Sequence, residues 1–176
     1  MATTTNNRLN TEYNLASGET YDLLSFDFPD GYPNSKLEFV FGSVPRKITG
    51  VQKVAQIFLK CLLTTKGSDL LDTTAGTQFP NYMKYSNITS SDTSEIYTVL
   101  YSSIQDAVSQ AKFILNSANV SRESQLSSVD IVNIIVKEEG YDIALRLLTK
   151  AGTTALVSVP FTSTGLTYNT ELTANG

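Results

Sequence analysis

The sequence predicts an α+β fold in which two main helices pack on an antiparallel β-meander of three to four strands, with an extended N-terminal arm. Three observations carry this prediction: two long stretches with helical periodicity, three strand-like segments in the last third, and a polar, turn-rich start. With 176 residues, 41% of them hydrophobic, the chain has the size and composition of one globular domain. We divide it into an arm (1–35), an α+β domain (36–162) and a polar tail (163–176).

The predicted arm is rich in Thr, Asn, Ser, Gly and Pro, and all its charges between Leu9 and Asn34 are acidic. The stretch 36–66 is basic, with Glu38 as its one acidic residue. Two interpretations fit this asymmetry: both regions are solvated faces, or the acidic arm lies on the basic helix face or on a basic neighbour. Apolar residues in the arm favour partial packing: Tyr21, Leu23, Leu24, Phe26 and Phe28.

A short strand is predicted over 37–41 from its alternating apolar residues, and a first helix follows. Thr49 and Gln52 have the spacing of a capping box, and Gly67 lies where a glycine is expected to stop the helix. Apolar residues recur between them at helical spacing and form one continuous stripe, with polar residues on the opposite face. The stripe consists of Val51, Val54, Ala55, Phe58, Leu59, Leu62 and Leu63.

A second helix of some 25 residues is predicted to begin near Asp92, which forms a capping box with Glu95, and to run to about 116–119. Tyr97 and Tyr101 lie one turn apart at the rim of its apolar stripe, where either packing or partner binding would suit tyrosine. The stripe consists of Ile96, Val99, Leu100, Ile104, Ala107, Val108, Ala111, Ile114 and Leu115.

The last third predicts three antiparallel strands, over 129–136, 141–148 and 155–161. Glu139-Gly140 and Ala151-Gly152 separate them and are typical of hairpin turns. Two alternating sets predict a sheet with one buried and one wet face. Ile143, Leu145 and Leu147 form the buried set; Asp142, Ala144 and Arg146 form the wet one.

Composition argues against several kinds of chemistry. The chain has no histidine, which removes the commonest general base and metal ligand, and its net charge of −4 disfavours a nucleic-acid partner. The single cysteine, Cys61, is expected to be a buried structural thiol. The start, MATTTNNRLN, lacks the pattern of a secretory signal, and no apolar run approaches a membrane span. We therefore expect no catalytic site, cofactor, metal or membrane contact.

Carboxylate pairs are the chemistry that survives the absence of histidine. Asp69 and Asp72 lie three residues apart beside glycines and could in principle act as an acid and a base. A glycosidase places its two carboxyl groups about 5–10 Å apart across a sugar cleft, usually on separate elements. The sequence instead favours surface or capping carboxylates for both residues.

One stretch resembles a known family. Gly50, Gln52 and Gln56 precede the run LLTTKG at 62–67, and Gly76 follows. This arrangement resembles the tail sheath initiators, the baseplate wedge family of contractile phage tails, also called the lysozyme-like baseplate family, which type VI secretion baseplates share. Family members carry a signature like Leu-Leu-Thr-Pro-Arg-Gly at this place, then a long helix and a β-meander. The resemblance covers roughly residues 45–161.

A second family hallmark fits less well. A Glu-Pro-Arg motif usually stands between the second helix and the meander and binds the helical bundle of other wedge subunits. This chain has Val-Ser-Arg-Glu at 120–123, so Arg122 can stand for the motif's arginine, but the proline is missing. The wedge contact is therefore expected to be absent or built differently.

The resemblance implies a structural protein of the virion tail baseplate, made in the host cytoplasm, that nucleates sheath assembly and joins wedge to hub in about six copies. Its implied partners are the tail sheath protein, wedge proteins, and tube or hub proteins. Sheath subunits link by exchanging strands, so the strand 155–161 and the tail after it are the candidate acceptors. The candidate interface residues are Thr64, Lys66, Gly67, Asp69, Gly76, Arg122, Val157, Val159 and Phe161.

Three alternatives remain: a baseplate subunit of a type VI secretion system or another contractile injection particle; a cell-wall glycosidase, a label that family members have carried; and a free-standing binding module.

Overall fold

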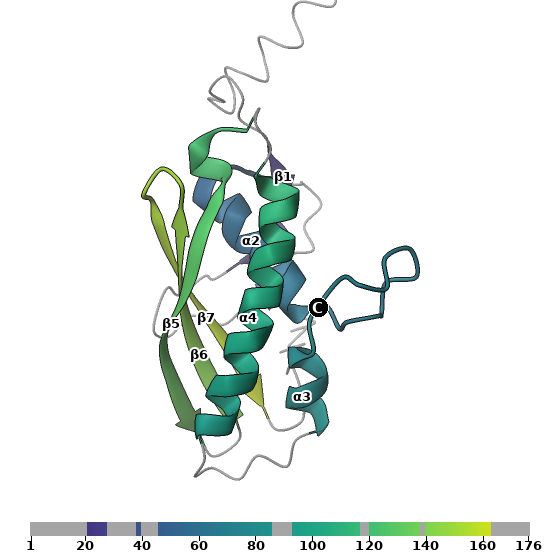
Figure 1. Ribbon diagram of the computed structural model, residues 1–176. Coiled ribbons are helices and arrows are strands. Elements are labelled where there is room, and N and C mark those ends of the chain that lie inside the picture. Colours follow the sequence, from purple (N-terminus) through teal and green to yellow (C-terminus); the bar gives the residue numbers. More distant parts are fainter. Residues whose placement is uncertain are drawn as a thin grey trace, which may run out of the picture.

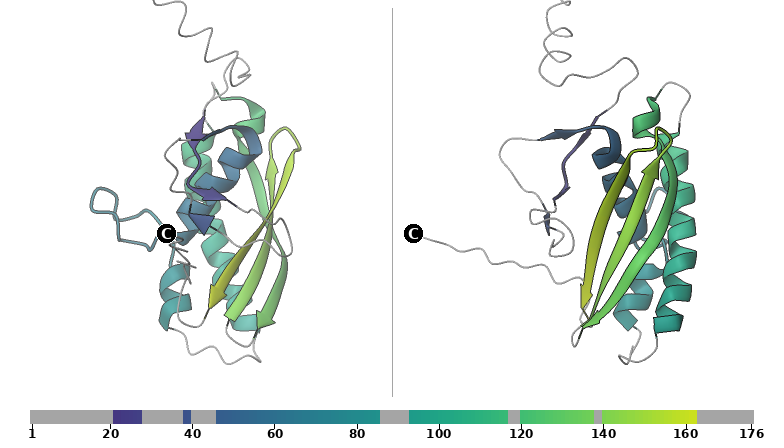
Figure 2. Two further views of the ribbon diagram at one scale, coloured as in Figure 1. Left: turned by 180° about the vertical axis from the view of Figure 1, so that it is seen from behind. Right: turned by 90° about the vertical axis from the view of Figure 1, so that its left-hand side faces the viewer.

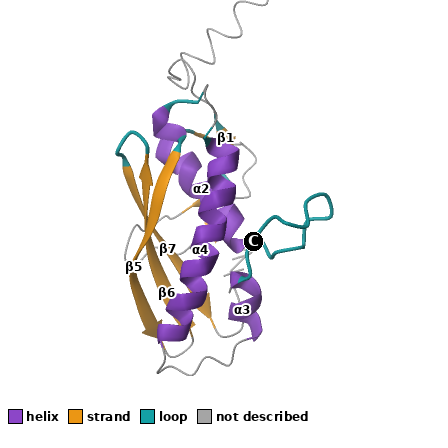
Figure 3. Cartoon of the chain, in the orientation of Figure 1, coloured by secondary structure: helices purple, strands orange, loops and turns teal. Residues whose placement is uncertain are grey.

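The protein has the α+β fold that the sequence predicts (Figure 1; Figure 3). The computed structural model describes residues 21–27, 38–39, 46–85, 93–116, 120–137 and 140–162. The long elements are α2 (Gly50–Leu63), α4 (Thr93–Leu115), β5 (Leu126–Lys137), β6 (Gly140–Thr149) and β7 (Thr154–Thr162). The short ones are β1 (Asp22–Leu23), β2 (Phe26–Asp27), β3 (Glu38–Phe39), β4 (Lys47–Ile48), α3 (Phe79–Tyr85) and the 3-10 helix η1 (Arg122–Ser124).

The body has two layers, a sheet of β5, β6 and β7 and the helix pair α2 and α4 on one of its faces (Figure 2). The hydrophobic core lies between the layers. Periodicity explains why: each helix turns one apolar stripe inward, and alternate residues of each strand point to the same side. The largest fully buried side chains include Phe58, Leu59 and Leu62 of α2, Ile96, Leu100 and Ile104 of α4, and Ile143, Leu145 and Leu147 of β6.

The predicted meander is confirmed, with strand order β5-β6-β7 and antiparallel pairing throughout. Two register shifts in β5, between Leu126 and Ser128 and between Ile131 and Asn133, are β-bulges; bulges increase the local twist of a strand. The predicted wet face needs one correction: Ala144 is buried, although Arg146 beside it is exposed. That face is therefore not uniformly wet.

Helix α2 differs from prediction at both ends. Thr49 is its N-cap, but the Thr49 side chain makes no capping hydrogen bond, so the predicted capping box is wrong. The N–H of Gly50 instead donates to Ser124 Oγ at 3.2 Å. The helix stops at Leu63, before Gly67, because Thr64 turns to an extended conformation. Ser124 thus ties the helix start to the residues that lead into β5, a contact over 74 positions that local sequence patterns do not encode.

Helix α4 confirms most of its predicted stripe and corrects one member. Ile114 is largely exposed, because its neighbours Ala111 and Leu115 occupy the core-facing positions of the last turn. Asn116 ends the helix: its side-chain amide accepts from the N–H of Leu126 and donates to the same residue's carbonyl, both at 3.1 Å. The predicted cap at Asp92 lies outside the described residues.

Helix α3 was not predicted, because its seven residues are too few to establish a helical period. Phe79 and Met83, one turn apart, are both buried and join the core. Thr77 begins the segment, since its Oγ accepts from the N–H of Phe79 at 3.2 Å and donates to the carbonyl of Leu62 at 2.8 Å. The segment is therefore held by the buried side chains of Phe79 and Met83 and by the hydrogen bond from Thr77 to α2.

Two short strand pairs complete the described part of the chain. β1 pairs with β4, and β2 with β3, both antiparallel. The predicted strand over 37–41 is described only as β3 at 38–39. No helix within the described ranges is long and apolar enough to cross a membrane. The proposed division at residue 35, and the tail from 163, fall largely on residues outside this description and stay predictions.

Candidate functional site

The loop between α2 and α3 contains five of the nine candidate interface residues and projects away from the body on the side opposite the sheet (Figure 1). Its two arms join in a parallel bridge between Thr65 and Thr77. The bridge is held by the N–H of Lys66 donating to Thr77 and that of Thr77 donating to Thr64, both at 2.9 Å. The loop therefore has a fixed base.

Gly76 closes this base by a close approach of two backbones. It has φ +85°, and a Cβ at this position would lie 2.4 Å from the carbonyl oxygen of Thr64. The side chain of Gln110 in α4 completes the junction: it accepts from the N–H of Gly76 and donates to its carbonyl, both at 2.8 Å. Only glycine fits here, which gives Gly76 a structural role.

Two other candidates, Lys66 and Gly67, lie in the turn that follows Thr65. Gly67 is left-handed with φ +80°, but within a turn in which the N–H of Ser68 donates to the carbonyl of Thr65 at 3.0 Å. The prediction that Gly67 stops the helix as a C-cap is therefore wrong. Gly67 is a turn residue. Lys66 is exposed beside it.

Asp69 and Asp72 shape the loop tip. Asp69 Oδ1 accepts from the N–H of Leu71 at 2.8 Å, and Asp72 Oδ1 accepts from the hydroxyl and the N–H of Thr74 at 2.6 and 3.0 Å. Hydrogen bonds from the Thr74 side chain and backbone lower the pKa of Asp72. Both are exposed surface carboxylates, one of the two roles that the sequence favours, and each accepts hydrogen bonds within its own turn.

Sequence reasoning missed the most exposed apolar feature among the described residues. Leu70 and Leu71 at the loop tip are 95% and 99% exposed. We call this pair the leucine knob. A signal was present: two adjacent leucines stand between aspartates, outside either helical stripe, where polar residues are the rule.

The outer edge of β7, which pairs with no strand in the described part of the chain and is called the free edge below, is the second candidate surface. The N–H of Thr149 donates to the carbonyl of Thr153 at 2.9 Å, which fixes the hydrogen-bonding phase of the β6–β7 ladder. In an antiparallel pair, bonded and non-bonded residue pairs alternate. Val157 and Val159, opposite Leu145 and Ile143, therefore bond to β6.

The same alternation turns the N–H and carbonyl of Thr154 and Leu156 toward the free edge. Pro160 belongs to this outward set too, which fits the rule that proline sits in an edge strand with its missing N–H on the open side. Thr154 and Leu156 are exposed, whereas Ser158 is buried. The accessible part of the edge is thus its beginning.

The predicted β7 candidates occupy different positions in this strand. The buried residues Val157 and Val159 point into the core, so their side chains maintain the sheet and do not meet a partner. Phe161 lies in β7, and its side chain is outside the described residues. The edge residue that the prediction missed is Leu156. Its outward orientation depends on the pairing register of β6 and β7, which cannot be deduced from the sequence.

Arg122 lies in η1, far from the loop. η1 packs at the start of α2, whereas the loop leaves its end, and fourteen residues of helix separate them, about 20 Å. Arg122 is exposed, and its neighbour Glu123 accepts from the hydroxyl of Thr153 in the β6–β7 turn at 2.5 Å. The structure therefore does not bring Arg122 together with the loop candidates.

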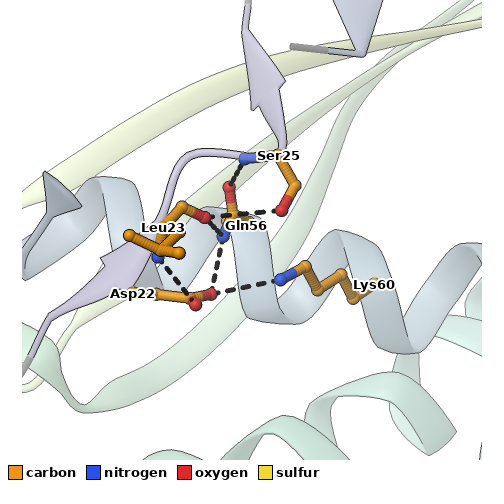
Figure 4. A network of polar contacts seen from close by, with 5 residues as sticks. All are labelled: Asp22, Leu23, Ser25, Gln56 and Lys60. Carbon is orange, nitrogen blue, oxygen red and sulfur yellow. Dashed lines mark hydrogen bonds and ion pairs between the residues drawn. The ribbon is translucent and has the colours of Figure 1, made fainter. Parts of the chain in front are cut away.

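Residues 22–25 are hydrogen-bonded to the polar face of α2 (Figure 4). Gln56 accepts from the N–H of Ser25 at 2.6 Å and donates to Asp22 Oδ2 and to the carbonyl of Leu23 at 2.6 and 2.7 Å. Lys60 Nζ lies 3.2 Å from Asp22 Oδ2. We call these five residues the arm clasp. It supports the interpretation in which the acidic segment lies on the basic helix, and it buries Gln56.

We expect the arm clasp to weaken in acid. Partial burial opposes ionisation of Asp22, but hydrogen bonds from Gln56, Leu23 and Lys60, with the charge of Lys60, outweigh it and lower the pKa below the usual 3.8. The lowered pKa means that the carboxylate stabilises the fold above about pH 4, and this stabilisation is lost as pH falls through the folded pKa.

The measurement compares urea unfolding of the wild type and Asp22→Asn at about pH 7 and about pH 3. The wild type should be the more stable at the higher pH, with the difference shrinking at the lower. An equal difference at both values would contradict the role of the charge.

Within the described ranges, no three His, Cys, Asp or Glu side chains gather as a metal site would require. Cys61 is buried, which raises the pKa of its thiol and makes it inert, as its position on α2 predicts.

Comparisons with protein-family models, with curated proteins and with solved structures found no match to this chain.

Proposed function

We propose that the protein is a structural baseplate component of a contractile tail, in which the free edge of β7 accepts a strand from the first ring of sheath subunits. The observation that carries the proposal is the pair of outward-facing main-chain positions, Thr154 and Leu156, at the exposed start of an edge strand. Strand addition takes its affinity from such main-chain groups and its register from alternate side chains.

The rest of the fold suits this role. An open edge on a long strand invites aggregation unless a partner covers it or the edge is interrupted. Pro160 and the buried Ser158 interrupt the second half of β7 and confine pairing to its first half. Helices α2 and α4 pack on one face of the sheet and support it.

The resemblance extends the proposal to partners. Wedge and tube or hub proteins would contact other surfaces in about six copies per baseplate, in a virion tail, and the protein would not be an enzyme. A type VI secretion baseplate or another contractile injection particle would use the same edge. The glycosidase alternative gains no support from Asp69 and Asp72, whose oxygens accept hydrogen bonds from their own loop. The free-standing binding module stays an untested alternative.

The test is reconstitution with a proline substitution at the edge. Leu156→Pro removes an outward N–H and leaves the β6–β7 ladder intact, so the protein should fold but fail to start sheath. Purified chain, sheath protein and tail tubes are mixed, and extended sheath is scored by negative-stain microscopy.

Val157→Pro is a poor test, since Val157 bonds to β6 and its substitution would break the sheet. Leu156→Thr is the matched control: it keeps the N–H, suits a strand, and should nucleate normally. Sheath formation by Leu156→Pro at the wild-type rate would count against the proposal.

A further inference from the structure

The leucine knob is held in a fixed shape. Asp69 and Asp72 each accept hydrogen bonds from the loop's own N–H groups, and Gln110 fastens its base to α4. Its two leucines are nevertheless almost fully exposed. A braced apolar tip that projects from the body is suited to insertion into a pocket, because little conformational freedom is lost when it binds.

A groove of about 320 Å³ lies between α4 and β5 on the same chain. Its apolar lining includes the buried side chains of Ile104, Val108 and Val129. Tyr97 and Tyr101 form part of its wall, stacked with ring centroids 6.4 Å apart and each about half exposed. We call this feature the α4–β5 groove.

The groove is large enough to admit side chains of the leucine knob. Its volume of about 320 Å³ is many times the roughly 10–15 Å³ that one buried water molecule needs. The lining is mixed, because Gln105, Ser127 and Ser128 stand beside the apolar side chains. Half-exposed tyrosines in such a setting are typical of protein interfaces, since one end of the ring packs while the hydroxyl stays wet.

The charges match as well. Lys112 lines the groove, and among the described residues no carboxylate forms an ion pair with it. The groove's own acidic residue, Asp130, is paired with Arg146 at 3.3 Å. Asp69 and Asp72 flank the leucines of the knob, so insertion would bring two carboxylates toward an available ammonium group.

From this complementarity we infer that the leucine knob of one copy docks in the α4–β5 groove of a second copy of this chain. The knob projects on the side of the molecule away from the sheet, whereas the groove lies where α4 meets β5 (Figure 1). The two surfaces differ, so two copies either pair reciprocally, each knob in the other copy's groove, or associate head-to-tail into a ring or a filament. This inference does not rest on the proposed sheath-initiating function.

The test detects contact between copies by paramagnetic broadening. Both chains carry Cys61→Ser, and one carries a nitroxide at Ser68→Cys, an exposed position beside the knob. The spin-labelled copy is mixed with a second copy that is enriched in nitrogen-15 and carries no spin label. The amide signals of this second copy are recorded. We expect selective loss of intensity at groove residues Gln105, Lys112 and Ser128.

Two controls make the result specific. A nitroxide at Ala151→Cys, exposed in the β6–β7 turn, should leave the groove signals unchanged. The double substitution Leu70→Ser and Leu71→Ser in the labelled copy should restore the groove signals of the observed copy. Both leucine side chains are exposed, so the substitutions should not disturb the fold. Lys112→Glu in the observed copy should weaken the loss.

Uniform broadening, broadening centred on another surface, or no difference between the labels at 68 and 151 would each overturn the inference. Sedimentation must show self-association as well, and a chain that stays monomeric at the concentration of the broadening experiment would also overturn the inference.

Discussion

Gly76→Ala should be among the most destabilising single substitutions in this chain. The new Cβ would lie 2.4 Å from the carbonyl oxygen of Thr64 and 2.9 Å from its carbon, at φ +85°. A left-handed conformation costs a non-glycine residue about 1–2 kcal/mol, and overpacking adds about 1–3 kcal/mol. We expect the free energy of unfolding to fall by about 2–5 kcal/mol in total, measured by equilibrium urea unfolding.

Gly152→Ala is the matched control. Gly152 is also left-handed, with φ +93°, but nothing lies within 4 Å of its Cβ position. Only the conformational cost of about 1–2 kcal/mol should remain. If the two substitutions cost the same, Gly76 does not close the loop base by a close backbone approach.

Phe58→Ala should cost about 3–5 kcal/mol of unfolding free energy, because a fully buried aromatic ring in α2 leaves a cavity in the core. Phe113→Ala deletes the same ring from α4, where it is 93% exposed, and should change stability by no more than about 0.5 kcal/mol. Thermal and urea unfolding of both variants check the pair. A large loss for Phe113→Ala would mean that this face of α4 is covered.

Long, strongly periodic segments were predictable because one period dominates many residues. The stripes of α2 and α4 and the alternation of Ile143, Leu145 and Leu147 define the core and the meander from sequence alone. The α+β class follows from their order. Segments of seven residues or fewer, such as α3, carry too little pattern, and tertiary packing of Phe79 and Met83 decides their structure.

Contacts between distant residues were not predictable. Ser124 caps the helix that the local pattern assigned to Thr49 and Gln52, and Asn116 ends α4 by bonding Leu126 across a loop. For the same reason Gln56 is buried although it lies on the polar face, because residues 22–25 cover it. Local rules apply only where no distant partner competes.

The candidate site was predicted in part. The glycines and carboxylates of the loop were found because their residue types have defined roles in turns, and Gly76 is the clearest case. Whether the N–H of Leu156 faces the free edge depends on how β7 pairs with β6. Whether the leucine knob is exposed depends on how far the loop projects from the rest of the fold. Neither property can be deduced from neighbouring residues in the sequence. Arg122 was grouped with the loop by resemblance alone, and the length of α2 separates them.

The most direct test of the strand-acceptor claim is amide hydrogen exchange of β7, with and without assembled sheath. The N–H groups of Thr154 and Leu156 face the free edge, and those of Ala155 and Val157 bond to β6 and serve as internal references. We expect exchange at 154 and 156 to slow when sheath is present, while 155 and 157 stay protected in both states. Unchanged exchange at Leu156 in particles with extended sheath would contradict it.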